Sequence, residues 1–117
     1  MKFYPPQSAA ASKIVATATA TSLYDLINTA GSTTNPRAGF PVDTNAVLIC
    51  VETNDCRVLF DSTPTATNGF LLTAGSIYPF YGVELEKMKL IRTGSDCTCS
   101  VLLGYADRGD AGFAINY

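Results

Sequence analysis

The sequence contains no histidine and no tryptophan. Without histidine, the chain cannot build Ser-His or Cys-His nucleophile pairs, and it has no imidazole to offer a metal. Neither the G-x-G-x-x-G pattern nor the Walker spacing is present, so no glycine-rich loop for binding phosphates is expected. We therefore predict a protein that is not an enzyme and that needs no cofactor.

Charge is also scarce, because only 15% of the 117 residues are charged and the net charge is −2. A chain with 8 basic and 10 acidic residues has no basic stripe that could follow a phosphate backbone, so nucleic acid is not an expected partner. Apolar residues make up 47%, which predicts a single packed domain. Much of the surface must then be neutral, and such a surface favours assembly with other subunits.

Long apolar runs are missing as well. Pro5 and Pro6 interrupt the run that a signal peptide would need, and no segment approaches the roughly 20 apolar residues of a membrane helix. We expect synthesis in the cytoplasm and no membrane partner.

Four cysteines are present, at positions 50, 56, 97 and 99. In a reducing compartment they are expected to stay free. Their spacings, C-x₅-C and C-x-C, differ from the C-x₂₋₄-C spacing that is usual at structural zinc sites. We predict no metal site and interpret Cys97 and Cys99 as small buried apolar residues.

The chain begins its regular structure with alternation over residues 13–21, which predicts one strand. A short helix is expected over residues 22–31, because Ser22 can cap its first amides and Asp25 supplies the second half of a capping box. Its apolar side consists of Leu23, Leu26 and Ile27.

Residues 46–61 predict a hairpin that turns at Asn54-Asp55 and places Val51 opposite Val58. A polar loop is expected over residues 62–69, followed by two extended pieces separated at Ala74-Gly75. Pro79 predicts that the second piece is an edge strand or a bend.

A second hairpin is predicted over residues 86–105, turning about Gly94-Ser95 and placing Leu90 opposite Cys99. Many short strands and one helix indicate an all-β protein. The predicted fold class is a jelly-roll-like antiparallel β-sandwich with one short helix near the N-terminus.

The predicted domain organisation is an N-terminal arm over residues 1–12, a β-sandwich over residues 13–106 and a C-terminal arm over residues 107–117. The arms carry aromatic residues at Phe3, Tyr4, Phe113 and Tyr117. Because an exposed ring gains free energy when it is buried on a partner, we expect an arm to dock on a neighbouring subunit. The alternative is that the arm folds back along its own sandwich as an edge strand.

Three aromatic residues, Tyr78, Phe80 and Tyr81, surround Pro79. Alternation sends Tyr78 and Phe80 to one face and Tyr81 to the other, so these rings could pack in the core, contact a subunit or bind a sugar. The one carboxylate pair that could run glycoside chemistry is Glu84 with Glu86, which we interpret as two solvated charges.

Two stretches, "RVLFDSTPTATNGFLLTAGS" (57–76) and "MKLIRTGSDCTCSVLLGY" (88–105), carry a family resemblance. A strand that ends in Asp, a Thr/Pro/Ala loop, a Gly-Leu-Leu-like segment and an "IR-TGSDA"-like hairpin resemble a group of small tailed-phage virion proteins. The resemblance covers roughly residues 16–106. The four cysteines and "IYPFYG" (77–82) depart from that group.

The resemblance implies a jelly-roll-like structural protein located in the virion. It implies a capsid decoration (cement) protein that forms a homo-oligomer, a trimer or dimer, and binds the major capsid protein. A neck or tail protein and a carbohydrate-binding β-sandwich are the alternatives. The candidate subunit or capsid contacts are Phe3, Tyr4, Tyr78, Phe80, Tyr81, Phe113 and Tyr117.

Overall fold

The computed structural model describes residues 13–31, 44–81 and 85–104. Its strands are β1 (Lys13–Ala16), β2 (Thr21–Ser22), β3 (Ala46–Thr53), β4 (Cys56–Phe60), β5 (Phe70–Leu72), β6 (Ile77–Tyr81), β7 (Met88–Arg92) and β8 (Cys97–Gly104). Its helices are α1 (Leu23–Gly31) and the short 3₁₀ helix η1 (Leu85–Lys87). The predicted arms lie outside the described residues.

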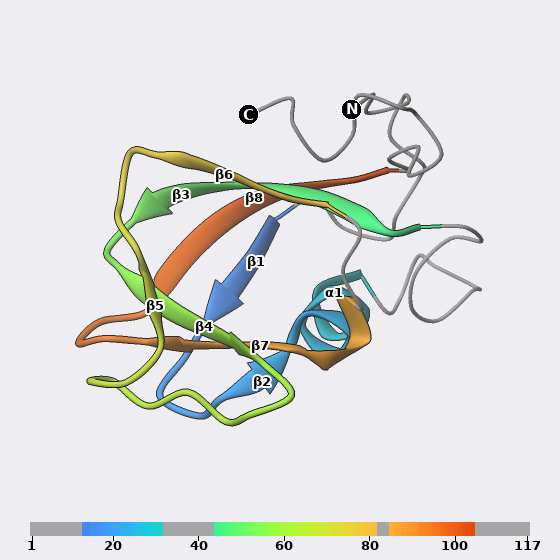
Figure 1. Cartoon of the computed structure of the whole chain (residues 1–117). Helices are drawn as coiled ribbons and strands as arrows, with labels where there is room; N and C mark the ends of the chain where they lie inside the picture. Colours follow the sequence, from blue (N-terminus) through green and yellow to red (C-terminus); the bar gives the residue numbers. More distant parts are fainter. Residues whose placement is uncertain (1–12, 32–43, 82–84, 105–117) are drawn as a thin grey trace, which may run out of the picture.

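The strands form two four-stranded sheets that face each other (Figure 1). The strand order is β1-β8-β3-β6 in the first sheet and β2-β7-β4-β5 in the second, and every pair is antiparallel. Helix α1 covers one end of the space between the sheets.

The strand pairing is that of a jelly roll. The first strand pairs with the eighth, the second with the seventh, the third with the sixth and the fourth with the fifth. This is the pairing of one long hairpin that has been rolled into two layers, and its tip is the loop between β4 and β5. The predicted all-β, jelly-roll-like class with a short helix near the N-terminus is confirmed.

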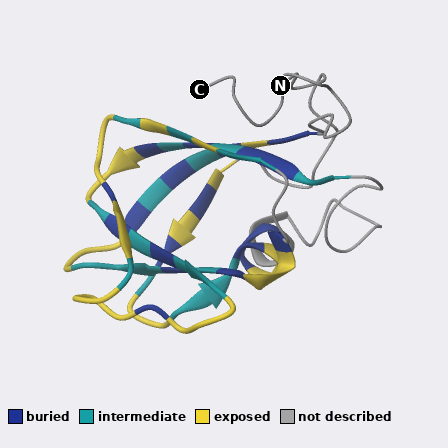
Figure 2. Cartoon of the chain, in the orientation of Figure 1, coloured by how far each residue is buried: buried dark blue, intermediate teal, exposed yellow. Residues whose placement is uncertain are grey.

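The core lies between the sheets, and buried residues alternate with less buried ones along the longer strands (Figure 2). Strand β3 shows the pattern clearly, because Val47, Ile49 and Val51 are fully buried while Leu48 and Cys50 are only half-buried. Each fully buried aliphatic side chain of this kind contributes about 1.5–3 kcal/mol relative to an exposed one. The predicted apolar faces are therefore the two inner faces of the sandwich.

Helix α1 forms as predicted. The side-chain oxygen of Ser22 accepts a hydrogen bond from the backbone N–H of Asp25 at 3.0 Å, which caps the first turn. Leu23, Leu26 and Ile27 are buried against the strands. No helix in the described part of the chain has the length and apolar character needed to cross a lipid bilayer.

The predicted hairpin over residues 46–61 is wrong. Strand β3 pairs with β6 and β8, whereas β4 pairs with β5 and β7 in the other sheet. Val51 is therefore aligned with Cys99 and not with Val58. The chain turns a corner between the sheets at Asn54, whose φ of 60° is left-handed. A corner and a hairpin leave the same residues facing the core, so alternation does not distinguish them.

The second predicted hairpin is wrong for the same reason. Strand β7 pairs with β2 and β4, and β8 pairs with β1 and β3, so Leu90 lies opposite Val58 and not opposite Cys99. The expected single strand over residues 13–21 is also divided between the sheets, into β1 and β2. The backbone N–H of Arg92 donates to the carbonyl of Thr17 at 2.9 Å, which ties this crossing to β7.

Pro79 lies inside β6, paired with Leu48. Strand β6 is at the edge of its sheet, which confirms the edge alternative. An edge strand has one unpaired side, so a residue without an N–H is accommodated there without a bend.

Candidate functional site: an apolar groove on an outer sheet face

The outer face of the β1-β8-β3-β6 sheet exposes large apolar side chains. Ile77 in β6 is 65% exposed, Leu102 in β8 is 49% exposed and Val15 in β1 is 40% exposed. They lie outside because their neighbours in sequence fill the core, and the strand period sends alternate residues to opposite faces. Three strands of one sheet thus present apolar side chains to solvent.

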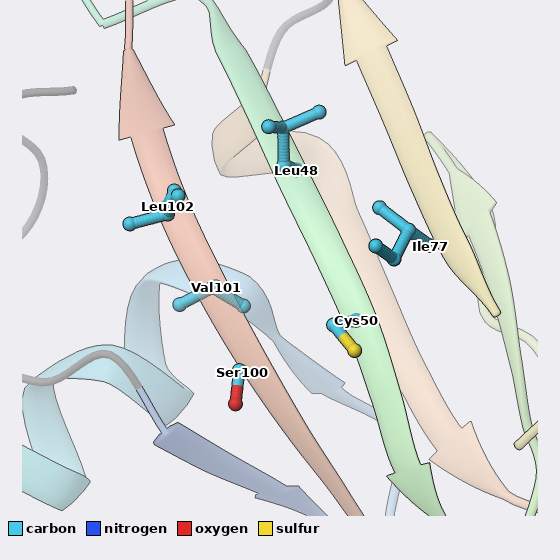
Figure 3. A pocket seen from close by; sticks show the side chains of 6 residues that line it. All are labelled: Leu48, Cys50, Ile77, Ser100, Val101 and Leu102. Carbon is cyan, nitrogen blue, oxygen red and sulfur yellow. The ribbon is translucent and has the colours of Figure 1, made fainter. Parts of the chain in front are cut away.

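A groove runs between Ile77 and Leu102 (Figure 3). Its volume is about 290 Å³. Its lining residues are Leu48, Cys50, Ile77, Ser100, Val101 and Leu102. The central strand β3 provides Leu48 and Cys50, with Leu102 of β8 on one side and Ile77 of β6 on the other. In the register of the sheet, Leu48 lies opposite Leu102, and Cys50 lies between Ser100 and Ile77.

One end of the groove is polar. The carboxylate of Glu52 accepts a hydrogen bond from the hydroxyl of Ser100 and forms an ion pair with Lys13 at 3.2 Å. The hydrogen bond from Ser100, and then the contact with Lys13, lower the pKa of Glu52 below its ordinary value of 4.5. The outer face therefore combines an apolar centre with one fixed pair of charges.

The chemistry of the groove suits association better than catalysis. Its lining has one thiol and one hydroxyl, and the carboxylate that contacts this hydroxyl, that of Glu52, is already paired with Lys13. Apolar side chains around a shallow groove are typical of surfaces that bury a partner's side chains.

Two of the predicted contact residues point away from this surface. Tyr78 and Phe80 are half-buried and pack against the core. The Phe80 ring lies 5.8 Å from the ring of Phe60, centre to centre, and the Tyr78 ring lies 6.4 Å from that of Phe70 in an edge-on arrangement. The rings of β6 thus close the open side of the sandwich beside β4 and β5.

Tyr81 follows the opposite alternation and belongs to the outer face, paired in the sheet with Ala46. The division of the three rings between two faces is the predicted one, and it does not form the single flat platform that the sugar-binding alternative needs. Phe3, Tyr4, Phe113 and Tyr117 lie outside the described residues, as does Glu84. Glu86 is exposed on η1.

The polar loop at the tip of the rolled hairpin is held by Arg57. The guanidinium of Arg57 donates to the carbonyl of Ala66 at 3.1 Å and to that of Gly69 at 2.9 Å. Within the loop, the hydroxyl oxygen of Thr65 accepts the N–H of Asn68 at 3.0 Å, and Pro64 is fully buried. These bonds give the loop a defined conformation, although its side chains carry no reactive group.

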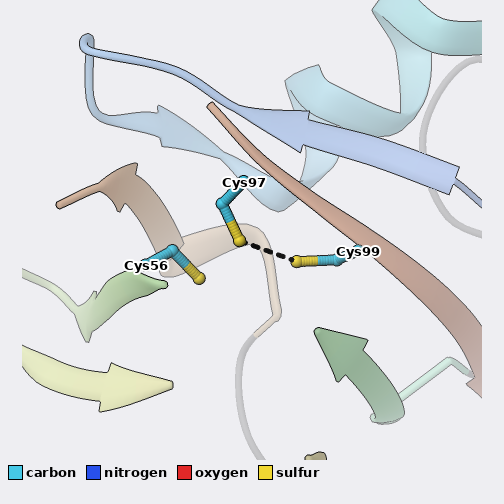
Figure 4. Close-up of side chains that lie close together, drawn as sticks. All are labelled: Cys56, Cys97 and Cys99. Atoms are coloured by element: carbon cyan, nitrogen blue, oxygen red, sulfur yellow. Dashed lines mark hydrogen bonds between the residues drawn. The ribbon is translucent and has the colours of Figure 1, made fainter. Parts of the chain in front are cut away.

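Three cysteines that the sequence separates come together inside the sandwich (Figure 4). Cys56 begins β4 in one sheet, while Cys97 and Cys99 are the first and third residues of β8 in the other, and all three are buried. Their sulfur atoms lie within 4.8 Å of one another, and those of Cys97 and Cys99 are 3.6 Å apart. The S–H of Cys97 is also placed to donate to the carbonyl of Asn54 at 3.5 Å.

The three thiols influence each other's protonation. Hydrogen bonds with Cys97 and burial raise the pKa of Cys56 to about 12, and hydrogen bonds with Cys56 and Cys97 together with burial raise that of Cys99. Hydrogen bonds from Cys56 and Cys99 lower the pKa of Cys97. The neighbouring thiols thus favour ionisation of Cys97, whereas ionisation of Cys56 or Cys99 is disfavoured.

Sequence reasoning missed this cluster because the predicted hairpin placed Cys56 opposite Thr53. The shared face of Cys97 and Cys99 was visible in the sequence, but the approach of Cys56 depends on the corner at Asn54.

Comparisons of the chain with protein-family models, curated proteins and solved structures found no match.

Proposed function

We propose that the protein is a non-enzymatic structural protein that docks the outer face of the β1-β8-β3-β6 sheet on another protein subunit. The observation that carries this proposal is the exposure of Ile77 and Leu102 on either side of the groove. Removing such apolar surface from water favours association, at about 25 cal/mol for each Å² buried. Contiguous exposed apolar side chains on a β-sandwich are a signature of an interaction surface.

The proposed partner is the major capsid protein of a tailed phage, and the protein is a capsid decoration protein that also forms a homo-oligomer. The family resemblance supports this assignment, together with the neutral, charge-poor composition. A stable interface buries about 800 Å² on each partner, which is more than the groove alone provides. The aromatic arms are the further surfaces proposed to contribute.

The test uses phage particles from which the protein has been stripped. Reduced binding is expected for the double variant Ile77→Ser with Leu102→Ser, because both changes remove apolar surface that lies outside the core. The matched control is Leu71→Ser, which changes a 37% exposed leucine in the other sheet and should leave binding intact. Far-UV circular dichroism and the melting temperature should be unchanged in all variants.

Copy number separates the capsid position from the alternative. A decoration protein should be present in many copies, comparable with the number of capsid subunits, whereas a neck or tail protein should be present in few copies. Equal binding by the double variant and the wild type would refute docking through the groove. The carbohydrate-binding alternative is not favoured, because Tyr78 and Phe80 pack inward.

A further inference from the structure

The cluster of Cys56, Cys97 and Cys99 plays no part in the proposed docking, since all three side chains are buried between the sheets. Elsewhere the described core consists of aliphatic and aromatic side chains and one methionine, Met88. A single buried cysteine needs no explanation beyond packing, because the thiol behaves as a small apolar group. Three sulfurs gathered at one place from two different sheets offer a coordination chemistry that aliphatic residues lack.

The spacing of the sulfurs is close to that of a metal site. A tetrahedral zinc site has Zn–S distances of about 2.3 Å, so its sulfurs are about 3.8 Å apart. Cys97 and Cys99 already have their sulfurs 3.6 Å apart, and the third sulfur lies within 4.8 Å of both. The distances of the Cys56 sulfur from the other two therefore exceed those of a zinc site by at most about 1 Å.

A fourth possible ligand atom, an oxygen, lies beside Cys97. The carbonyl oxygen of Asn54 lies 3.5 Å from the sulfur of Cys97, at the corner where the chain crosses from β3 to β4. This separation is that of two neighbouring corners of a coordination tetrahedron. Three sulfurs and one oxygen make four donors, which is the number of ligands that zinc has at structural sites.

We propose that Cys56, Cys97 and Cys99 bind one soft divalent metal ion of the zinc type, with the Asn54 carbonyl as the fourth ligand. Each thiol that enters the site releases its proton to solvent. A divalent ion then leaves one net negative charge among three thiolates, whereas monovalent copper would leave two in the same buried place. The charge balance therefore selects the divalent ion.

Such an ion would connect the two sheets. Cys56 belongs to the β2-β7-β4-β5 sheet, and Cys97 and Cys99 belong to the β1-β8-β3-β6 sheet. Cys56 directly follows the corner at Asn54 and Asp55, and Cys97 directly follows the corner between β7 and β8. The metal would thus hold these two corners at one point.

The experiment compares wild-type protein with single cysteine variants, each refolded under reducing conditions with Zn²⁺ or Cd²⁺ and then desalted. The matched control is Cys50→Ala, which removes the one cysteine outside the cluster. Wild type and Cys50→Ala should retain one metal ion per chain, and the cadmium forms should show thiolate-to-metal charge-transfer absorption. Cys56→Ala and Cys97→Ala should lose both signals. Zinc should raise the melting temperature of the wild type by roughly 5 °C or more.

A second measurement needs no variant and so does not depend on how a variant folds. X-ray absorption of the wild-type zinc form should show three sulfur ligands and one oxygen ligand. Metal content that is unchanged in Cys56→Ala and Cys97→Ala, a zinc shell without sulfur, or a refolded wild type that takes up no metal would overturn the proposal. Uptake of Cu⁺ without uptake of Zn²⁺ would overturn the divalent assignment.

Discussion

Arg57 is the residue whose removal should show how firmly the tip of the rolled hairpin is held. Its guanidinium bonds two loop carbonyls, those of Ala66 and Gly69, from a half-buried position in β4. A hydrogen bond to a charged donor contributes about 1.5–3 kcal/mol, and the bond to Ala66 is exposed and so contributes less. The variant Arg57→Ala should therefore lower the free energy of unfolding by about 1.5–3 kcal/mol.

Urea unfolding measures this loss. With a slope of about 1–3 kcal/mol per molar urea, the midpoint should fall by roughly 1 M while the slope stays constant. Limited proteolysis should cut the variant faster within residues 62–69. Arg57→Lys should lie between the two proteins, because an ammonium group keeps the charge but lacks the fork that reaches both carbonyls.

Lys89 provides the control. It lies on the same outer face of the same sheet, half-buried, and its side chain makes no hydrogen bond or ion pair with the residues that the structure describes. Lys89→Ala should change stability by no more than about 0.5 kcal/mol, as is usual at such surface positions. If Arg57→Ala were no less stable than Lys89→Ala, the loop would not depend on the arginine and the reasoning would fail.

Two further predictions concern a charge and a helix cap. Because Ser100 and Lys13 lower the pKa of Glu52 in the folded state, ionised Glu52 stabilises the fold above its ordinary pKa of 4.5. Glu52→Gln should therefore be less stable than wild type at pH 7. This difference in stability should shrink as the pH falls below 4.5 and through the lowered pKa. A difference that persists in strong acid would show that ionisation of Glu52 is not its cause. Ser22→Ala removes the cap on the N–H of Asp25 and should cost about 1 kcal/mol in thermal or urea unfolding, with Ser22→Asp restoring most of it.

Local signals in the sequence predicted local structure well. The cap at Ser22 and the buried side of α1 follow from neighbouring residues, and the inner faces of the strands follow from alternation. The strand pairing could not be predicted in this way, because a jelly roll joins residues far apart in the chain, such as Val51 and Cys99. A two-residue turn between alternating strands fits a hairpin and a corner equally well.

In the candidate site, too, some features follow from local sequence and others depend on how the strands pair. Exposure of Ile77 and partial burial of Tyr78 are consequences of alternation within β6, so the sequence indicated that this strand has two different faces. The groove itself depends on the neighbours of Leu48 in two other strands, and the thiol cluster depends on a contact between the two sheets. Both required the order of the strands, which composition and periodicity do not contain.

The ends of the sheets set the form that any assembly of this domain can take. Among the described residues, the edge strands are short, with four residues in β1, two in β2 and three in β5, and the five-residue β6 contains Pro79. Such edges have few free backbone N–H and C=O groups, so a strand from another chain could form few hydrogen bonds with them. Copies should therefore not join into a continuous sheet. When copies associate through the side chains of one sheet face, association stops once that face is buried. We therefore expect bounded particles with a fixed number of copies, and no fibres, even at high protein concentration.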